Sequence, residues 1–172
     1  TAKAAQELGT MMLIRPGDYS DRLRPYSSSL IPCLTGTDCL HHRDMLRHCR
    51  VVEMADGPDI EQRLIQVRAV HPDLVIMVGL PLDGGSAGRV LALTRYPVDT
   101  IHCYADAEGR ELARNPRFLK EAIRDIHLKL VDNACRQRIN LLFSGGIAMA
   151  EHMAKSIICG ADAVGIDYAL TL

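Results

Sequence analysis

The chain has 172 residues, of which 48% are apolar, and its 20 basic side chains are nearly balanced by 21 acidic ones. This size and apolar content indicate a single globular domain over residues 1–172 with a substantial core. A formal charge of -1 gives no support for binding to nucleic acid or to an acidic membrane, and no apolar run approaches the ~20 residues that a membrane helix needs.

Predicted strands and helices alternate along the chain. A short helix over residues 1–8 is expected to stop at Gly9, and residues 15–29 are expected to form a long loop. The expected strands lie at residues 10–14, 30–34, 50–54, 73–80, 99–104, 139–143 and 161–166. The expected helices lie near residues 38–49, 56–71, 115–130 and 148–159, and residues 82–93 are expected to form a glycine turn that leads into a helix. A further helix is expected to begin near Tyr168.

Helical periodicity predicts which faces of the last two long helices are buried. The stripe in the helix near residues 115–130 comprises Leu119, Ala122, Ile123, Ile126 and Leu130. In the helix near residues 148–159, the residues expected to face inward are Ala150, Met153, Ala154, Ile157 and Ile158. Glu151 and Lys155 are expected to pair on its outer face.

Strands separated by helices imply a parallel sheet of an α/β protein. A doubly wound sheet and a (β/α)8 barrel both satisfy this order of elements. Seven strands that open on a helix fit a TIM-barrel-like fold without its first strand, since a complete barrel takes about 250 residues. We therefore expect an incomplete (β/α)8 fold, and a chain that is part of a longer polypeptide or an assembly.

Glycines follow the last two predicted strands, where parallel α/β folds bind their ligands. Two adjacent glycines let backbone amides approach an anion, and the helix that follows adds its positive end. The candidate phosphate-binding residues are Ser144, Gly145, Gly146, Gly165, Ile166 and Asp167. The alternative is that the glycines only permit tight turns. The Asp167 carboxylate would repel a phosphate unless it caps the next helix.

The segment "SGGIAMAEHMAKSIICGADAVGIDYAL" resembles the end of the FMN-binding (β/α)8 barrel of the glutamate synthase family. The segments "AAQELGTMMLIRPGDYSDRLRPYSSSLIP", "RVVEM", "DLVIMVGLPLDGGSAGRVLAL" and "DTIHCYADAEGRE" resemble earlier strands of that barrel, in the same order. Other phosphate-binding barrels, such as inosine monophosphate dehydrogenase, end similarly. The resemblance implies that the candidate residues above hold the phosphate of FMN.

The resemblance also implies an activity and a setting. The expected activity is an FMN-dependent oxidoreductase that makes glutamate from 2-oxoglutarate and ammonia in the cytoplasm, within an oligomer or a redox complex. An iron–sulfur cluster is expected only outside this chain.

Two departures from the family pattern keep another function open. The strand at residues 73–80 lacks the lysine that the family carries near the flavin, and glycines after two strands are reduced to "ADGPD" and "YADAEGRE". Arg89, Arg95 or Arg110 could supply the missing cation. The alternative is a non-catalytic, barrel-derived subunit of a larger complex, and a third possibility is a sugar-phosphate or nucleotide isomerase.

Several other polar residues are candidates for a functional site. His102, on a predicted strand, is a candidate general acid or base or a hydrogen-bonded core residue. Asp83-Gly84-Gly85-Ser86 is expected to be a simple turn rather than a second anion site. No metal site is expected, because the cluster Cys39, His41, His42, His48 and Cys49 fits no known zinc spacing. The six cysteines are expected to be reduced thiols, with Cys103 and Cys159 in the core.

Overall fold

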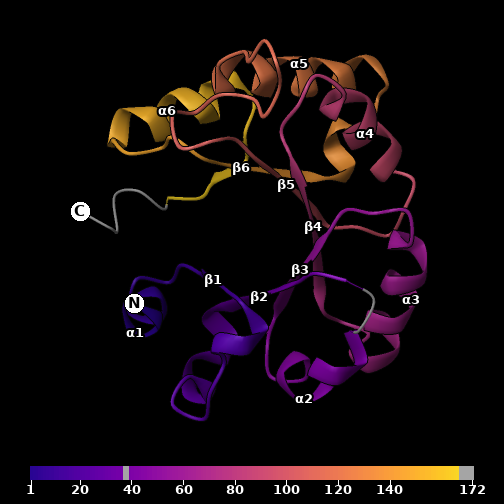
Figure 1. The fold of residues 1–172 in the computed structure, drawn as a ribbon, viewed down its shortest axis with the longest axis vertical. Helices are drawn as coiled ribbons and strands as arrows, with labels where there is room; N and C mark the ends of the chain where they lie inside the picture. The colour runs from indigo at the N-terminus through magenta and orange to yellow at the C-terminus, as the bar shows by residue number, and fades with distance from the viewer. Residues whose placement is uncertain (37–38, 167–172) are drawn as a thin grey trace. The chain divides into compact units, whose positions relative to one another are not determined.

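The computed structural model describes residues 1–36 and 39–166, without the side chains of Cys39 and Leu40 (Figure 1). The predicted helix near Tyr168 therefore lies outside the described residues. Tertiary contacts divide the chain into two compact units, Thr1–Val78 and Gly79–Leu172.

In its described residues, the first unit carries three complete strands and three α-helices. They are α1 (Ala2–Glu7), β1 (Met12–Ile14), β2 (Leu30–Leu34), α2 (Arg43–Leu46), β3 (Val51–Ala55) and α3 (Ile60–Val70). Short 3-10 helices lie at Pro16–Asp18, Arg24–Ser29 and Cys39–His42. Strand β1 pairs in parallel with β2, and β2 pairs in parallel with β3.

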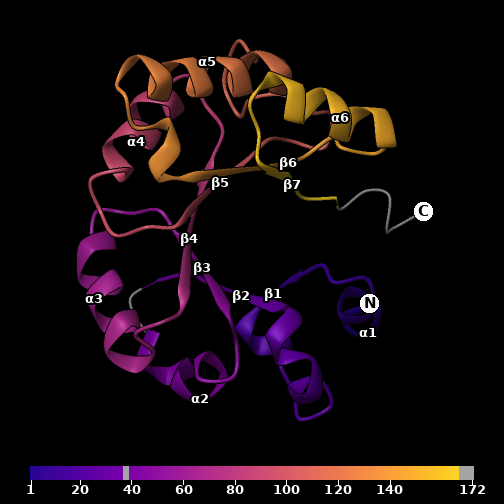
Figure 2. The same ribbon diagram turned by 180° about the vertical axis from the view of Figure 1, so that it is seen from behind.

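Strand β4 (Val75–Pro81) crosses the division between the units, and the remaining elements belong to the second unit. They are α4 (Ser86–Leu93), β5 (Thr100–Tyr104), α5 (Leu119–Asp132), the 3-10 helix Arg136–Arg138, β6 (Asn140–Ser144), α6 (Ala150–Cys159) and β7 (Ala163–Val164). Strands β5, β6 and β7 pair in parallel, and α5 lies between α4 and α6 on one side of them (Figures 1 and 2).

The strands follow the order of the chain, from β1 to β7. Doubly wound sheets reverse their strand order partway, whereas TIM-like barrels add each strand beside its predecessor. The fold class is therefore α/β and TIM-barrel-like, with seven strands in the described residues. This confirms the predicted incomplete (β/α)8 fold and rejects the doubly wound alternative.

The strands of the second unit have two distinct faces. Ile101, Cys103, Leu141 and Phe143 are fully buried, and α5 buries the predicted stripe from Leu119 to Leu130. Because side chains alternate along a strand, His102 and Ser144 point to the opposite face from Cys103 and Phe143. The register pairs His102 with Leu142 and Tyr104 with Ser144, so this second face gathers polar groups near the strand ends.

The predicted inward face of α6 is wrong. Met153, Ile157 and Ile158 are 40%, 45% and 85% exposed, and Ala150 and Ala154 are exposed too. Ser156 is the buried residue of this helix. Helix α6 packs against α5 and the two-residue β7, so its buried face is set by these narrow contacts rather than by a broad sheet surface.

Two predicted helix boundaries also differ. The expected helix near residues 38–49 is a 3-10 turn followed by the short α2, and α5 begins at Leu119 rather than at Asn115. Residues before α5 fold back instead, because Arg110 forms an antiparallel bridge with Phe118 and the Leu119 amide donates to the Gly109 carbonyl over 2.8 Å.

The cysteines whose side chains are described are all free thiols: Cys33, Cys49, Cys103, Cys135 and Cys159. Cys103 is in the core as predicted, whereas Cys159 is only half-buried. Burial raises the pKa of Cys103 to about 12 and that of Cys49 to about 11.

We expect Cys49 and Cys103 to resist modification in the folded protein. Only a thiolate attacks Ellman's reagent, and burial both raises the thiol pKa and blocks access. At mildly alkaline pH, labelling followed by peptide mass spectrometry should show these two residues reacting more than about tenfold more slowly in the folded than in the denatured protein. Equal rates in the two states would contradict the buried positions.

Candidate functional site

The double-glycine turn, residues Ser144-Gly145-Gly146, stands at the carboxyl end of β6. Gly145 and Gly146 have φ values of +95° and +68°, in the left-handed region that favours glycine. A Cβ on Gly145 would lie 2.5 Å from the Ala105 carbonyl oxygen, and a Cβ on Gly146 would collide with the Gly109 amide nitrogen. The turn therefore packs backbone to backbone on the loop that joins β5 to α5.

This packing explains why both positions are glycine without any ligand, as the alternative interpretation of the sequence holds. The packing leaves the amides of the two glycines without a hydrogen-bond role. In the described part of the chain, the amides of Gly145 and Gly146 have no hydrogen-bond acceptor. The N-cap of α6, Met149, provides no side-chain hydrogen bond either. The turn thus offers donors at the positive end of a helix, as an anion site requires.

Gly165 differs from these glycines. Its amide donates to the Phe143 carbonyl over 2.8 Å, so that group belongs to the sheet. A Cβ on Gly165 would lie 3.0 Å from the Ser144 Cβ, and its absence leaves space beside that side chain. Ile166 is 43% exposed. Asp167, the last predicted site residue, lies outside the described residues.

His102 and Ser144 come together although 42 residues separate them. His102 Nε2 lies 2.7 Å from Ser144 Oγ, and the imidazole is only 4% exposed. The Tyr104 ring meets the imidazole edge-on, with 5.8 Å between the ring centroids. The structure therefore places the candidate acid–base residue in contact with the first residue of the double-glycine turn.

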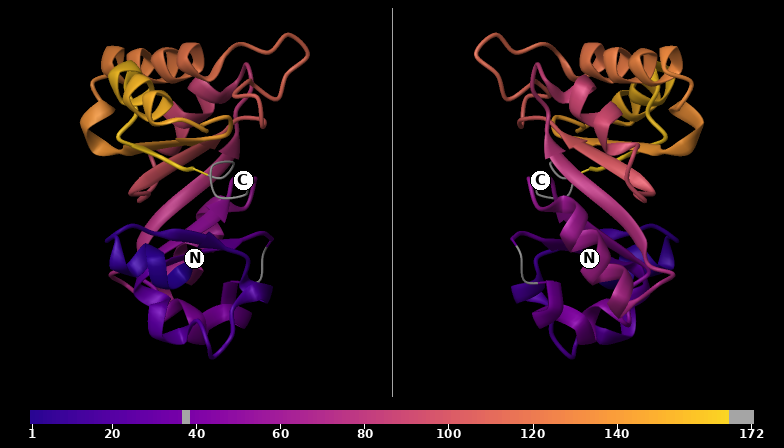
Figure 3. Two further views of the ribbon diagram at one scale, coloured as in Figure 1. Left: turned by 90° about the vertical axis from the view of Figure 1, so that its left-hand side faces the viewer. Right: turned by 90° about the vertical axis from the view of Figure 1, so that its right-hand side faces the viewer.

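Ionic and hydrogen-bond contacts within the β5–α5 loop, residues 105–118, brace the loop, and the Ala105 amide donates to the Ser144 carbonyl over 2.9 Å. Asp106 Oδ1 accepts hydrogen bonds from the amides of Glu108 and Arg110 at 3.0 and 2.8 Å. The buried Glu111 carboxylate binds the Arg117 guanidinium, with Nη2 to Oε1 at 2.6 Å. The hydrogen bonds from Arg117 lower the pKa of Glu111 below its ordinary value of 4.5. The loop projects away from α5 and α6 in Figure 3.

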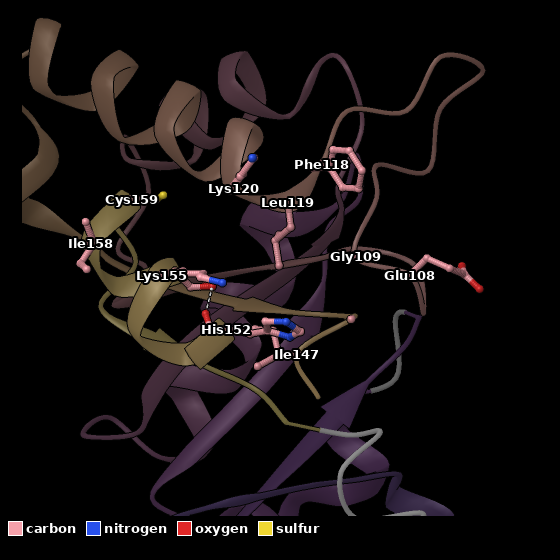
Figure 4. Close-up of a pocket in the computed structure, with 12 residues that line it drawn as sticks. Glu108, Gly109, Phe118, Leu119, Lys120, Ile147, His152, Lys155, Ile158 and Cys159 are labelled. Carbon is pink, nitrogen blue, oxygen red and sulfur yellow. Dashed lines mark hydrogen bonds between the residues drawn. The ribbon is translucent and has the colours of Figure 1, made fainter. Parts of the chain in front are cut away.

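A pocket of about 470 Å³ lies beside this loop, between the start of α5 and one face of α6 (Figure 4). We call it the α5–α6 pocket. It is lined by Glu108, Gly109, Phe118, Leu119, Lys120, Gly146, Ile147, His152, Lys155, Ser156, Ile158 and Cys159.

Sequence reasoning missed the α5–α6 pocket. Helical spacing predicts Lys155 on the outer face of its helix, and no motif in the sequence points to Lys120. A usable signal was present in α6, where His152, Lys155, Ser156 and Cys159 follow a spacing of three, four and seven residues. They form a polar face that lines a cavity.

Other sequence candidates have structural partners. His48 Nδ1 lies 2.7 Å from the Asp44 carbonyl oxygen, and its Nε2 lies 3.2 Å from Arg24 Nη2. Among residues with described side chains, no group of three or more His, Cys, Asp or Glu could hold a metal ion. In the expected turn at residues 83–86, Asp83 Oδ1 accepts the Gly85 amide at 2.8 Å, so this carboxylate occupies the place of an added anion.

The fold and this corner define a TIM-barrel-like α/β protein with a glycine turn at a strand end. Residues 110–171 match a family model described as a conserved region in glutamate synthase. The chain therefore carries a glutamate synthase-related region, and the resemblance seen in its sequence is confirmed there. No match is found among curated protein sequences.

Substituting Gly146 by Ala should destabilise the protein by about 2–5 kcal/mol. The substitution forces an alanine into the left-handed region of backbone conformation, and its Cβ collides with the backbone of Gly109. Gly88→Ala is the matched control, because a Cβ there meets nothing within 4 Å and α4 gains about 1 kcal/mol of helix propensity. Chemical denaturation measures both. Equal stabilities of the two variants would show that the turn does not pack as described.

Glu111→Gln should lower the free energy of unfolding near neutral pH by about 1–3 kcal/mol, the range for a hydrogen bond to a charged group. The folded-state pKa of Glu111 is lowered, so its contribution is present above its ordinary value of 4.5 and is lost as pH falls through the lowered pKa. Denaturation curves at several pH values should show the difference from wild type shrinking in acid. A difference that is constant with pH would refute the ion pair.

Proposed function

We propose that this chain is part of the FMN-binding barrel of a glutamate synthase-type oxidoreductase, which forms glutamate from 2-oxoglutarate and ammonia. The observation that carries the proposal is the match of residues 110–171 to the glutamate synthase region, which includes the whole double-glycine turn. The order of the strands supports it, because the resemblance implied a barrel of this kind.

In this function the double-glycine turn holds the phosphate of FMN. The amides of Gly145 and Gly146 supply donors, and the amino end of α6 adds its partial positive charge. Gly165 leaves room beside Ser144, and its own amide stays in the sheet. These residues fit a phosphate group, with the donors coming from one strand end rather than from two.

The flavin, when bound, supplies the redox chemistry, and the chain supplies position and proton transfer. His102 is the proposed acid–base residue. Its contact with Ser144 fixes the ring on the polar face of β5 and β6, next to the phosphate corner. A group held in one orientation transfers a proton more efficiently than one that must first be ordered.

One observation favours a second candidate function. Strand β4 carries no lysine, so the cation expected near the flavin is missing from Val75–Pro81. Among the proposed substitutes, Arg110 stacks on the Phe118 ring, with its guanidinium carbon 4.1 Å from the ring centroid. The alternative is therefore a non-catalytic, barrel-derived subunit of a redox complex.

The setting is part of the proposal. Among the described residues, no helix combines the length and the apolar character needed to cross a membrane. We propose a cytoplasmic enzyme in which other subunits or domains complete the barrel and carry any iron–sulfur cluster. The relationship to glutamate synthase over residues 110–171 supports membership of such a larger enzyme.

Flavin titration tests this function. The purified chain should bind FMN, seen as quenching of flavin fluorescence, and should bind riboflavin at least about 30-fold more weakly because riboflavin lacks the phosphate. Equal affinity for both would contradict the phosphate site. Failure to bind either flavin, in protein shown to be folded by circular dichroism, would leave the non-catalytic function as the better one.

A further inference from the structure

We infer that the α5–α6 pocket binds a small organic anion at a site separate from the proposed flavin site. Its volume of about 470 Å³ falls within the roughly 300–1,000 Å³ of small-molecule sites. All of its lining residues belong to the second unit of the chain.

Two ammonium groups from different helices supply the positive charge. Lys120 comes from the first turn of α5, and Lys155 comes from the middle of α6 (Figure 4). Lys155 Nζ lies 3.0 Å from Glu151 Oε1, so its charge is partly balanced. Lys120 forms no ion pair with any residue that the structure describes, which leaves its charge available to a ligand.

The pocket also has an apolar wall. Leu119 and Ile147 are 8% and 1% exposed, whereas the Phe118 ring is 46% exposed. The Arg110 guanidinium stacks on this ring, which adds a further positive charge close to the pocket. A ligand with an apolar body and one anionic head matches this combination of an exposed ring and nearby cations.

Carboxylates near the pocket oppose this ligand class. In the lining itself, Lys120 and Lys155 outnumber the one carboxylate, Glu108. Just outside the lining, Glu151 binds Lys155, and the positive charge of Arg110 on the Phe118 ring is offset by Glu121, whose Oε2 accepts the Phe118 amide at 3.0 Å. The lining itself therefore favours an anion over a cation, and Lys120 is the cation without a paired carboxylate among the described residues.

The α5–α6 pocket shares Gly146 with the double-glycine turn, but its other walls come from the β5–α5 loop, Ile147, α5 and α6 rather than from β7. Gly165 and Ser144, which lie against each other on the polar strand face, are not among its lining residues. Flavin and anion would therefore be held on different sides of the same turn.

Phenyl phosphate is a suitable probe, with phenol as its neutral counterpart. Titration of the ¹⁵N-labelled chain should shift the amide signals of Gly109, Gly146 and Ser156 in a saturable way with phenyl phosphate, and much less with phenol. Lys120→Gln should weaken the binding about five- to tenfold, which is the loss of one charge-assisted contact. Lys129→Gln is the matched control, since it removes the same charge from α5 outside the pocket.

Three outcomes would overturn the inference. They are equal binding of phenol and phenyl phosphate, equal weakening by the two lysine variants, and displacement of the probe by FMN in competition. The last would make the pocket part of the flavin site. Saturable probe binding in a chain that binds no flavin would support the inference while contradicting the proposed function, so the two failures are distinguishable.

Discussion

The contact between the double-glycine turn and the β5–α5 loop is the constraint on which the candidate site depends. Neither Gly145 nor Gly146 has room for a Cβ, because the backbone of residues 105–109 occupies that space. This contact fixes the loop, and the loop in turn sets where α5 begins through the hydrogen bond from Leu119 to Gly109. One wall of the α5–α6 pocket and the double-glycine turn are thus held by the same backbone contact.

The same glycines have two separate physical properties. Their missing side chains allow the loop to approach, and their amides remain available as donors. Packing and anion binding are therefore compatible explanations of one sequence feature. The backbone of the β5–α5 loop packs against the Cα atoms of both glycines, which a tight turn by itself does not require. The ion pair between Glu111 and Arg117 braces this loop, which phosphate binding by itself does not require.

Polar side chains lie on both sides of the double-glycine turn. On the strand side, the buried His102 contacts the half-buried Ser144, and Gly165 leaves space beside Ser144. On the helix side, Lys120 and Lys155 face a cavity with an apolar wall. Helix α6 contributes to the second group because its polar face lines the pocket, while its apolar residues Met153 and Ile157 remain exposed outside the pocket.

The sequence by itself determined the seven strands, the parallel α/β class and the buried stripe of α5, because short-range periodicity and turn chemistry control these features. It predicted the wrong face for α6, since periodicity shows that a helix has two faces but not which one meets a neighbour. Tertiary structure alone decided the contacts His102–Ser144 and Gly109–Gly146 and the placement of Lys120 and Lys155 around one pocket. In each case the two residues are more than 30 positions apart, and only chain folding sets such distances.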